Sequence, residues 1–199
     1  MNRALDLLIA ACALAVSSPL LAICALAIKL DSRGPVFYRQ RRVGRSGVQF
    51  DLCKLRTMVV DAENQGAGLY IEDRDPRITR VGRLLRRFSL DELPNLFNVI
   101  SGELAIVGPR PTVQSQVDRY TDHQRRRLEV RPGITGWAQV NGRTSLSWPE
   151  RIELDVWYVD NRSLLLDSKI LARTVRMLVT GHGLYSADLT QGWKEDDPA

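Results

Sequence analysis

The sequence predicts a mostly helical α+β protein: a re-entrant membrane helix-break-helix, then a compact interfacial domain with a small β-hairpin and amphipathic helices. Three observations predict this class. Residues 7–28 are apolar apart from one Ser-Ser-Pro step. Two strand-like stretches then flank a glycine-bearing turn, and later segments repeat apolar residues at helical spacing. We therefore expect a membrane segment (1–30), a folded domain (31–185) and a C-terminal tail (186–199).

The apolar N-terminal segment decides the class. In a helix its 22 residues would reach roughly 33 Å, enough to cross a bilayer core. Pro19 near the middle removes a backbone hydrogen bond, and Ser17 and Ser18 can satisfy the freed carbonyls. Arg3 precedes the segment and Lys29 follows it, so positive charge stands on both sides. We expect a re-entrant segment with its break at Ser18 and Pro19.

Two other interpretations of this segment stay open. A single helix that spans the membrane fits the length of the apolar run, and kinked spanning helices are common. A cleaved signal peptide would need a shorter apolar core before its small-residue cleavage site, whereas this run continues well past Ala13-Leu14-Ala15.

The composition excludes several classes for the rest of the chain. The 199 residues carry a net charge of +5 and are 44% hydrophobic, which is not typical of a disordered chain. The two histidines stand alone, and the three cysteines show no paired spacing. A Cys/His zinc site and a disulfide framework are therefore not expected.

The folded domain shows a clear order of local signals. A glycine-bearing turn indicates a hairpin, helical spacing of apolar residues marks the helices, and a capping box opens one of them. Pro94 is tolerated only in a first helical turn, which fixes where its helix starts. The expected elements are strands over 35–44 and 48–58 joined at 44–47, a mobile loop over 61–76, a helix over 77–88, a helix that starts between 89 and 93, loops over 108–111 and 130–143, a helix that opens at 147–150, and a final helix over 164–179.

Asp91 and Glu92 are the most informative pair of residues. They stand at the predicted start of a helix, where the helix dipole favours ionised carboxylates, and the ordinary interpretation of such residues is capping. Arg86 lies just upstream, and Arg110 follows the same helix in a Gly-Pro-Arg-Pro step. Because arginine binds two phosphate oxygens at once, this set suits a phosphate ester held with Mg²⁺. A basic patch on anionic lipid is the alternative for the arginines.

The run SLDELPNLFNVISGELAIVGPRP (89–111) resembles the central signature of bacterial sugar transferases, the small monotopic polyprenyl-phosphate phosphoglycosyltransferases. The resemblance continues in the same order along most of the chain, through the Ser18-Pro19 step and the stretches 34–44, 54–58, 131–143 and 150–167. Larger relatives carry several transmembrane helices and a further domain before this core. The chain, which starts at the apolar segment, is therefore similar to the minimal form of the family.

The resemblance implies a double displacement. Asp91 would attack the sugar-bearing phosphate of a UDP-sugar and release UMP. Polyprenyl phosphate, usually undecaprenyl phosphate, would then take the phosphosugar from the aspartate, a step that initiates the assembly of a surface glycan or glycoconjugate. Glu92 would hold Mg²⁺ together with Asp91. The phosphate or nucleotide contacts would be Arg86, Lys54, Arg110 and Arg143.

The implied partners are a UDP-sugar, polyprenyl phosphate and inner-membrane lipid, at the cytoplasmic face of the bacterial inner membrane. The sequence does not identify the sugar, and it leaves the oligomeric state open, a homodimer included. The rival function is a membrane-anchored basic protein that binds nucleic acid or anionic lipid. We expect no nucleic-acid partner, because the basic helix over 77–88 has only Phe88 as an aromatic neighbour.

Overall fold

A computed structural model describes residues 2–65, 75–142 and 146–180, and the described part is mostly helical with two small sheets. Most of the loop expected over 61–76, the tail expected over 186–199 and Arg143 lie outside the described residues. The helices and strands are α1 (Arg3–Asp31), β1 (Phe37–Val43), β2 (Gln49–Leu55), α2 (Arg80–Arg87), α3 (Asn95–Ser101), β3 (Ala105–Val107), α4 (Gln114–Val117), α5 (Asp122–Arg125), β4 (Gly133–Thr135), α6 (Trp137–Val140), α7 (Trp148–Asn161) and α8 (Leu164–Thr180). Short 3-10 turns are η1 (Arg45–Gly47), η2 (Ala62–Asn64), η3 (Leu90–Glu92) and η4 (Arg126–Glu129).

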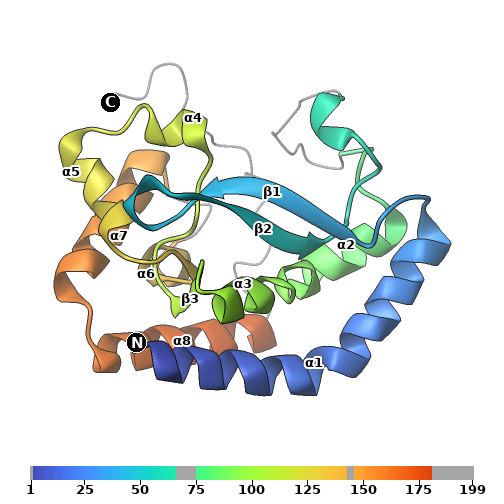
Figure 1. Cartoon of the computed structure of the whole chain (residues 1–199), viewed down its shortest axis with the longest axis horizontal. Helices are drawn as coiled ribbons and strands as arrows, with labels where there is room; N and C mark the ends of the chain where they lie inside the picture. Colours follow the sequence, from blue (N-terminus) through green and yellow to red (C-terminus); the bar gives the residue numbers. More distant parts are fainter. Residues whose placement is uncertain (1, 66–74, 143–145, 181–199) are drawn as a thin grey trace.

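Helix α1 is bent rather than broken. The sequence predicted a break at Ser18 and Pro19, but the helix continues through both residues over its 29 positions and changes direction partway along (Figure 1). Proline lacks the N–H that would bond to the carbonyl of Ala15. The Ser18 hydroxyl donates to that carbonyl at 2.9 Å, as the serines were expected to do. Because the freed carbonyl keeps a donor, the helix can bend without ending. By length and composition α1 could cross a membrane.

The N-terminal end of α1 is bonded to the folded body. The Arg3 guanidinium donates to the carbonyls of Val99 and Ile100 near the end of α3, at 2.6 and 2.9 Å. Asp6 is 1% exposed, and its carboxylate accepts a hydrogen bond from the backbone N–H of Ile106 in β3 at 3.0 Å. A polar start of an apolar helix is thus paired with backbone groups of two other elements.

The C-terminal end of α1 is bonded to the same body. The buried Arg56 guanidinium donates to the carbonyls of Ser32 and Arg33, just past the helix, at 2.9 and 2.6 Å. Cys24 in the second half of α1 shares a core cluster with Leu85 of α2. Both ends of the apolar helix therefore contact one globular unit.

The predicted hairpin is present, and the register of its strands determines which side chains share its half-buried face. Strands β1 and β2 are antiparallel, with Tyr38 opposite Lys54. Because side chains alternate between faces, Tyr38, Gln40 and Arg42 share the half-buried face of β1 with Lys54 of β2. The hairpin thus lines up one lysine and one arginine towards the interior of the molecule.

A second, parallel pair of strands runs through segments that the sequence assigned partly to loops. Ala105 in β3 pairs with Gly133 in β4, and the Gly108 N–H donates to the Thr135 carbonyl at 2.9 Å. A Cβ on Gly133 would lie 2.1 Å from the Gly108 nitrogen. The glycines that indicated a loop are required here because two backbones approach closely.

The two C-terminal helices start where the sequence predicted them. The Ser147–Glu150 capping box opens α7, and α8 begins at Leu164. The largest core cluster joins residues from α1, β2, α3, α7 and α8: Ala10, Leu52, Val99, Tyr158 and Ile170 are among its members.

A substitution at Gly82 tests how closely α2 packs against the backbone at Thr57. A Cβ at this position would lie 2.0 Å from the Thr57 carbonyl oxygen, a backbone atom just beyond β2. We expect Gly82→Ala to destabilise the protein by about 1–3 kcal/mol through overpacking. Helix propensity alone predicts the opposite sign, a gain of up to about 1 kcal/mol. Urea unfolding of the detergent-solubilised protein measures the difference. Arg83→Ala, at an exposed position of the same helix, is the control and should change stability by less than about 0.5 kcal/mol.

Candidate active site

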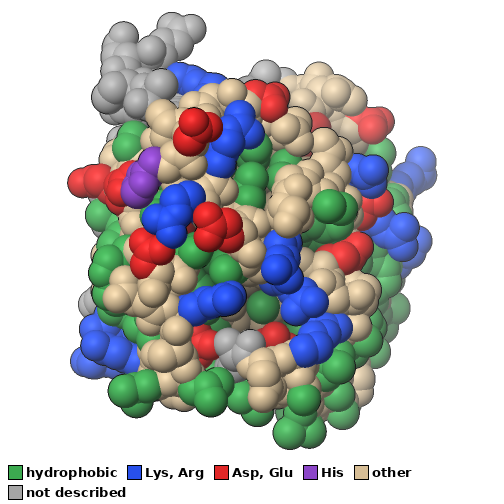
Figure 2. Space-filling view, turned by 60° about the vertical axis from the view of Figure 1, so that its left-hand side comes forward, with side chains coloured by type: hydrophobic (Ala, Val, Ile, Leu, Met, Phe, Trp, Pro, Cys, Tyr) green, Lys and Arg blue, Asp and Glu red, His purple; other side chains and the backbone are tan. Residues whose placement is uncertain are grey.

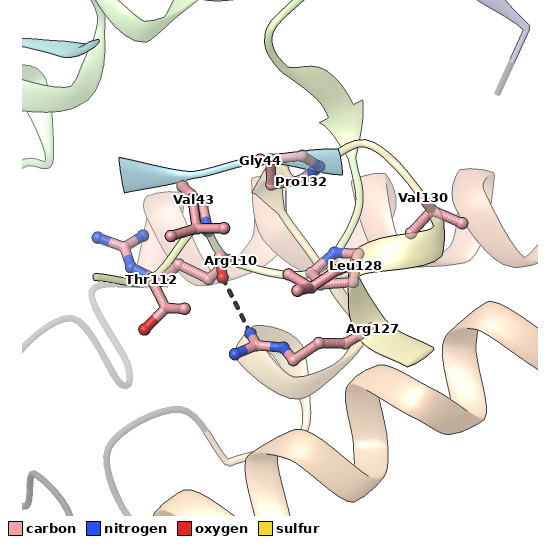
Figure 3. A pocket seen from close by; sticks show the side chains of 10 residues that line it. Val43, Gly44, Arg110, Thr112, Arg127, Leu128, Val130 and Pro132 are labelled. Carbon is pink, nitrogen blue, oxygen red and sulfur yellow. Dashed lines mark hydrogen bonds between the residues drawn. The ribbon is translucent and has the colours of Figure 1, made fainter. Parts of the chain in front are cut away.

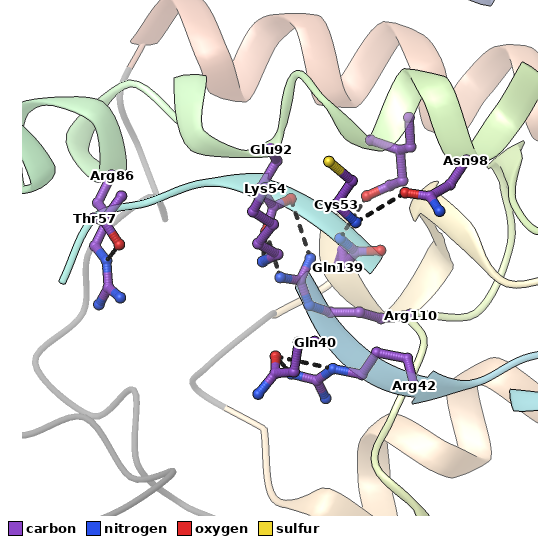
Figure 4. Close-up of polar contacts among 11 residues, drawn as sticks. Gln40, Arg42, Cys53, Lys54, Thr57, Arg86, Glu92, Asn98, Arg110 and Gln139 are labelled. Carbon is purple, nitrogen blue, oxygen red and sulfur yellow. Dashed lines mark hydrogen bonds and ion pairs between the residues drawn. The ribbon is translucent and has the colours of Figure 1, made fainter. Parts of the chain in front are cut away.

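Three of the residues that the sequence singled out meet at one carboxylate. Glu92 Oε1 accepts from Lys54 Nζ at 2.9 Å and from Arg110 Nη2 at 2.5 Å (Figure 4). Lys54 comes from β2, Glu92 from η3, and Arg110 from the loop after β3. Side chains 38 and 18 residues from Glu92 in sequence thus share one small cluster.

Asn98 explains why η3 lies over Lys54. Its side-chain carbonyl accepts from the Cys53 N–H at 3.0 Å, and its amide donates to the Asp51 carbonyl at 2.8 Å. This buried side chain fixes α3 to the edge of β2. Since η3 immediately precedes α3, its Glu92 is held next to Lys54.

The carboxylates of η3 do not act as helix caps. Ser89 has a φ of 54° and begins a short 3-10 turn, and α3 starts only at Asn95. Neither helix start has a side-chain capping hydrogen bond. The capping interpretation is therefore not supported. The Asp91 carboxylate forms no hydrogen bond with any residue in the described part of the chain.

The two adjacent carboxyl groups differ in electrostatics. Burial opposes ionisation of Glu92, but Arg110 and Lys54 outweigh it and hold the pKa of Glu92 well below its ordinary value. Burial, and then the charge of Glu92, raises the pKa of Asp91, against the opposing effects of Lys54, Arg86 and Arg110. The expectation that a helix N-terminus lowers the pKa of Asp91 is thus wrong for the protein without ligands. The reason is that desolvation and the charge of Glu92 act on Asp91, which lies in η3, before α3 begins.

Arg127 holds the loop that carries Arg110. Its guanidinium donates to the backbone carbonyl of Arg110 at 2.9 Å (Figure 3). It also donates to Asp155 at 2.5 Å and bonds to the Tyr120 hydroxyl. Arg127 and Asp155 are both almost fully buried. A buried pair of this kind fixes geometry, because removing one partner would leave an uncompensated charge. The Arg110 side chain itself remains 42% exposed.

Arg86 approaches the site without bonding to Glu92. Its Nε donates to the Thr57 hydroxyl at 2.8 Å, and its charge favours the ionised form of Asp91. Arg86 therefore belongs to the electrostatic surroundings of Asp91.

Arg42 is a cation of the site that the sequence analysis did not single out. It bonds to Gln40 at 3.1 and 2.5 Å. Burial, and then repulsion by Arg110, lowers the pKa of Arg42 to about 10. The alternation of β1 was the available signal, because it puts Arg42 on the face of Lys54.

The site carries more positive than negative charge. Arg42, Lys54, Arg86 and Arg110 surround Asp91 and Glu92. Figure 2 shows Lys and Arg side chains gathered on one face of the molecule, with acidic side chains between them. Two guanidinium groups that repel each other attract an anion, and arginine suits phosphate oxygens. The arrangement can therefore hold a phosphate or diphosphate next to a carboxylate.

The described residues offer a partial metal site. They contain no group of three or more His, Cys, Asp or Glu that could enclose an ion. Mg²⁺ is commonly bound by one or two carboxylates together with substrate phosphates and water. Asp91 fits that second type of site, since its oxygens form no hydrogen bond with the described residues. Glu92 would have to exchange a bond to Lys54 or Arg110 in order to contribute an oxygen.

Comparisons with known proteins identify the family of the chain. The family model for bacterial sugar transferases matches residues 1–181. The chain is 45% identical to the sugar transferase EpsL of Bacillus subtilis, covering 92% of this chain and 90% of EpsL. It is 43% identical to the UDP-glucose:undecaprenyl-phosphate glucose-1-phosphate transferase of Caulobacter vibrioides, covering 92% of this chain and 72% of that protein.

A longer relative matches over the same region. The UDP-N-acetylgalactosamine-undecaprenyl-phosphate N-acetylgalactosaminephosphotransferase of Aeromonas hydrophila is 42% identical, over 92% of this chain but 44% of its own length. Because the family model matches nearly the whole chain and EpsL is 45% identical along 90% of its length, the chain belongs to the bacterial sugar transferase family.

Proposed function

We propose that this protein transfers a phosphosugar from a UDP-sugar to polyprenyl phosphate, releases UMP, and so initiates the assembly of a surface glycan or glycoconjugate. The observation that carries the proposal is the pair Asp91–Glu92 inside a cluster of four cations. The named activities of the Caulobacter and Aeromonas relatives support the same reaction class. The substrate that this site suits has two adjacent phosphates and a sugar.

The proposed chemistry is a double displacement at phosphorus. A carboxylate oxygen of Asp91 bonds to the sugar-bearing phosphorus, and the bond from that phosphorus to the bridging oxygen breaks, which releases UMP. A phosphate oxygen of polyprenyl phosphate then attacks the same phosphorus. The bond to Asp91 breaks, the carboxylate is restored, and polyprenyl diphosphate sugar leaves. Covalent catalysis of this kind divides one difficult transfer into two easier steps.

The cations have distinct tasks in this scheme. Lys54 and Arg110, held by Glu92, neutralise charge on the phosphoryl oxygens, and Arg86 and Arg42 face the remaining phosphate. Asp91 and Glu92 would hold Mg²⁺, which supplies further neutralisation of phosphate charge when bound. A bound cation would also favour the ionised form of Asp91, which burial opposes in the protein alone.

We further propose that α1 is re-entrant and that the body lies on the cytoplasmic face of the inner membrane. Arg3 and Asp6 at one end, and Arg56 at the other, bond α1 to one globular unit. A helix crossing the bilayer would put its ends on opposite faces. The bend at Pro19 and the positive charge at both ends support the same arrangement.

The reaction class is tested by a panel of UDP-sugars, each incubated with undecaprenyl phosphate, Mg²⁺ and the purified protein. UMP release with formation of a lipid-linked product is the expected result for at least one sugar. No transfer with any UDP-sugar would contradict the proposed function.

Asp91 tests the covalent step. We expect Asp91→Asn to abolish both UMP release and the phosphosugar adduct, because an amide is a far weaker nucleophile than a carboxylate. Intact mass after brief exposure to a UDP-sugar without lipid acceptor measures the adduct. Asp51→Asn, at a half-exposed carboxylate of β2, is the matched control and should still form it. An active Asp91→Asn protein would exclude Asp91 as the nucleophile.

Arg86 and Arg110 test the phosphate contacts. Each Arg→Ala variant should remain folded by circular dichroism and lose roughly 100-fold or more in kcat/KM, equivalent to a few kcal/mol of lost stabilisation. Arg41→Ala, on the exposed face of β1, should retain activity. If either variant is unfolded, that arginine is structural and its assignment to phosphate is wrong.

Labelling of a cysteine at position 2 tests the topology. We expect Asn2→Cys to react with an impermeant thiol reagent only from the cytoplasmic side, in a background where Cys12 and the half-buried Cys53 are replaced by serine. Adding Ser18→Leu and Pro19→Ala should straighten α1 and favour spanning. Reaction of the unstraightened protein only from the periplasmic side would rule out the re-entrant form.

A further inference from the structure

An apolar groove runs along one face of α1 across its bend. Its wall on α1 includes Ala15, Ser18, Leu21 and Ala22, and the opposite wall is formed by Phe37 of β1 and Phe97 of α3. The groove has a volume of about 490 Å³. That volume is in the range of pockets that hold small ligands.

The walls of the groove offer hydrocarbon contacts alone. Ser18 carries the only side-chain hydroxyl among its lining residues, and that hydroxyl is bonded to the Ala15 carbonyl. Phe37 and Phe97 remain 47% and 49% exposed, so the body does not pack over them. A nucleotide or a sugar would find no polar partner here, whereas an alkyl or isoprenoid chain would.

The groove shares packing neighbours with the segment that carries Asp91. Leu21 of the groove and Leu90 pack against the same core cluster, and Leu90 is the neighbour of Asp91 in η3. Phe97 is in α3, which directly follows η3. A chain in the groove therefore has its end close to the groups that attract phosphate.

We propose that this groove binds the first isoprene units of the polyprenyl phosphate acceptor. The inference rests on the proposed function and adds the subsite for the lipid chain. In a polyprenyl phosphate the phosphate is joined directly to a single chain, so the chain can fill the groove while the doubly charged phosphate reaches the cations. A phospholipid joins two chains to its phosphate through glycerol and carries less charge there. The single chain and the greater charge of its phosphate therefore both favour polyprenyl phosphate over a phospholipid as the ligand of the groove.

The test compares the same substitution inside and outside the groove. Ala22 lines it, whereas Ala11 is exposed on the same helix away from it. We expect Ala22→Phe to fill the groove and raise the KM for undecaprenyl phosphate roughly tenfold or more. Its KM for the UDP-sugar and its UMP release in a single turnover without lipid should stay unchanged. Ala11→Phe should behave as the parent protein does.

A second pair of variants tests the groove from α3, without any change in α1. Phe97→Ala removes part of the wall opposite α1. Ile100→Ala removes a similarly exposed side chain of the same helix that does not line the groove. We expect only Phe97→Ala to raise the KM for undecaprenyl phosphate. A short-chain isoprenyl phosphate that ends within the groove should show the same increase, whereas an acceptor with a single isoprene unit should show little.

The outcomes separate the two proposals. If the parent protein releases UMP and makes product, but each groove variant matches its control, the groove does not bind the acceptor and the proposed function stands. If a groove variant loses single-turnover UMP release as strongly as it loses transfer to the lipid, its defect lies in the first displacement. That result would also contradict the proposal that the groove binds the acceptor. If the parent protein transfers nothing to polyprenyl phosphate, the proposed function itself fails.

Discussion

The bonding of both ends of α1 to one folded body is the constraint on which the rest of the structure depends. Arg3 and Asp6 attach the start of the helix to α3 and β3, and Arg56 holds the chain just past its end. A straight helix of 29 residues would reach about 43 Å, so the bend brings its ends closer together. The apolar helix and the polar body thus form one unit, and Leu90 of η3 packs against the same core cluster as Leu21 of α1.

The active-site cluster depends on buried charges that are only partly compensated. Glu92 fixes Lys54 and Arg110, while Arg42 and Arg86 leave a surplus of positive charge around Asp91. Preorganised charges of this kind need little rearrangement when a diphosphate enters. The raised pKa of Asp91 is the consequence of burying two adjacent carboxyl groups, and it is the feature that a bound cation would relieve.

Local signals predicted several elements correctly and failed where a distant segment intervened. The hairpin, the capping box of α7 and the start of α8 follow from turn and capping chemistry within a few residues, and the structure confirms them. The parallel pair β3–β4 was missed, because Gly133 indicates a loop until Gly108 is known to lie against it. Arg42 was missed as a site residue because its neighbour Arg110 is distant in sequence.

The sequence by itself determined the family, the apolar segment and the residue types at the site, because these are written in contiguous motifs. Only the tertiary structure decided that α1 bends without breaking, since the outcome depended on a donor from Ser18 reaching the Ala15 carbonyl. It also decided that Glu92 bonds Lys54 and Arg110 instead of capping α3, and that burial raises the pKa of Asp91. The physical reason is shared: burial and charge pairing are set by groups brought together from distant segments, which no local pattern contains.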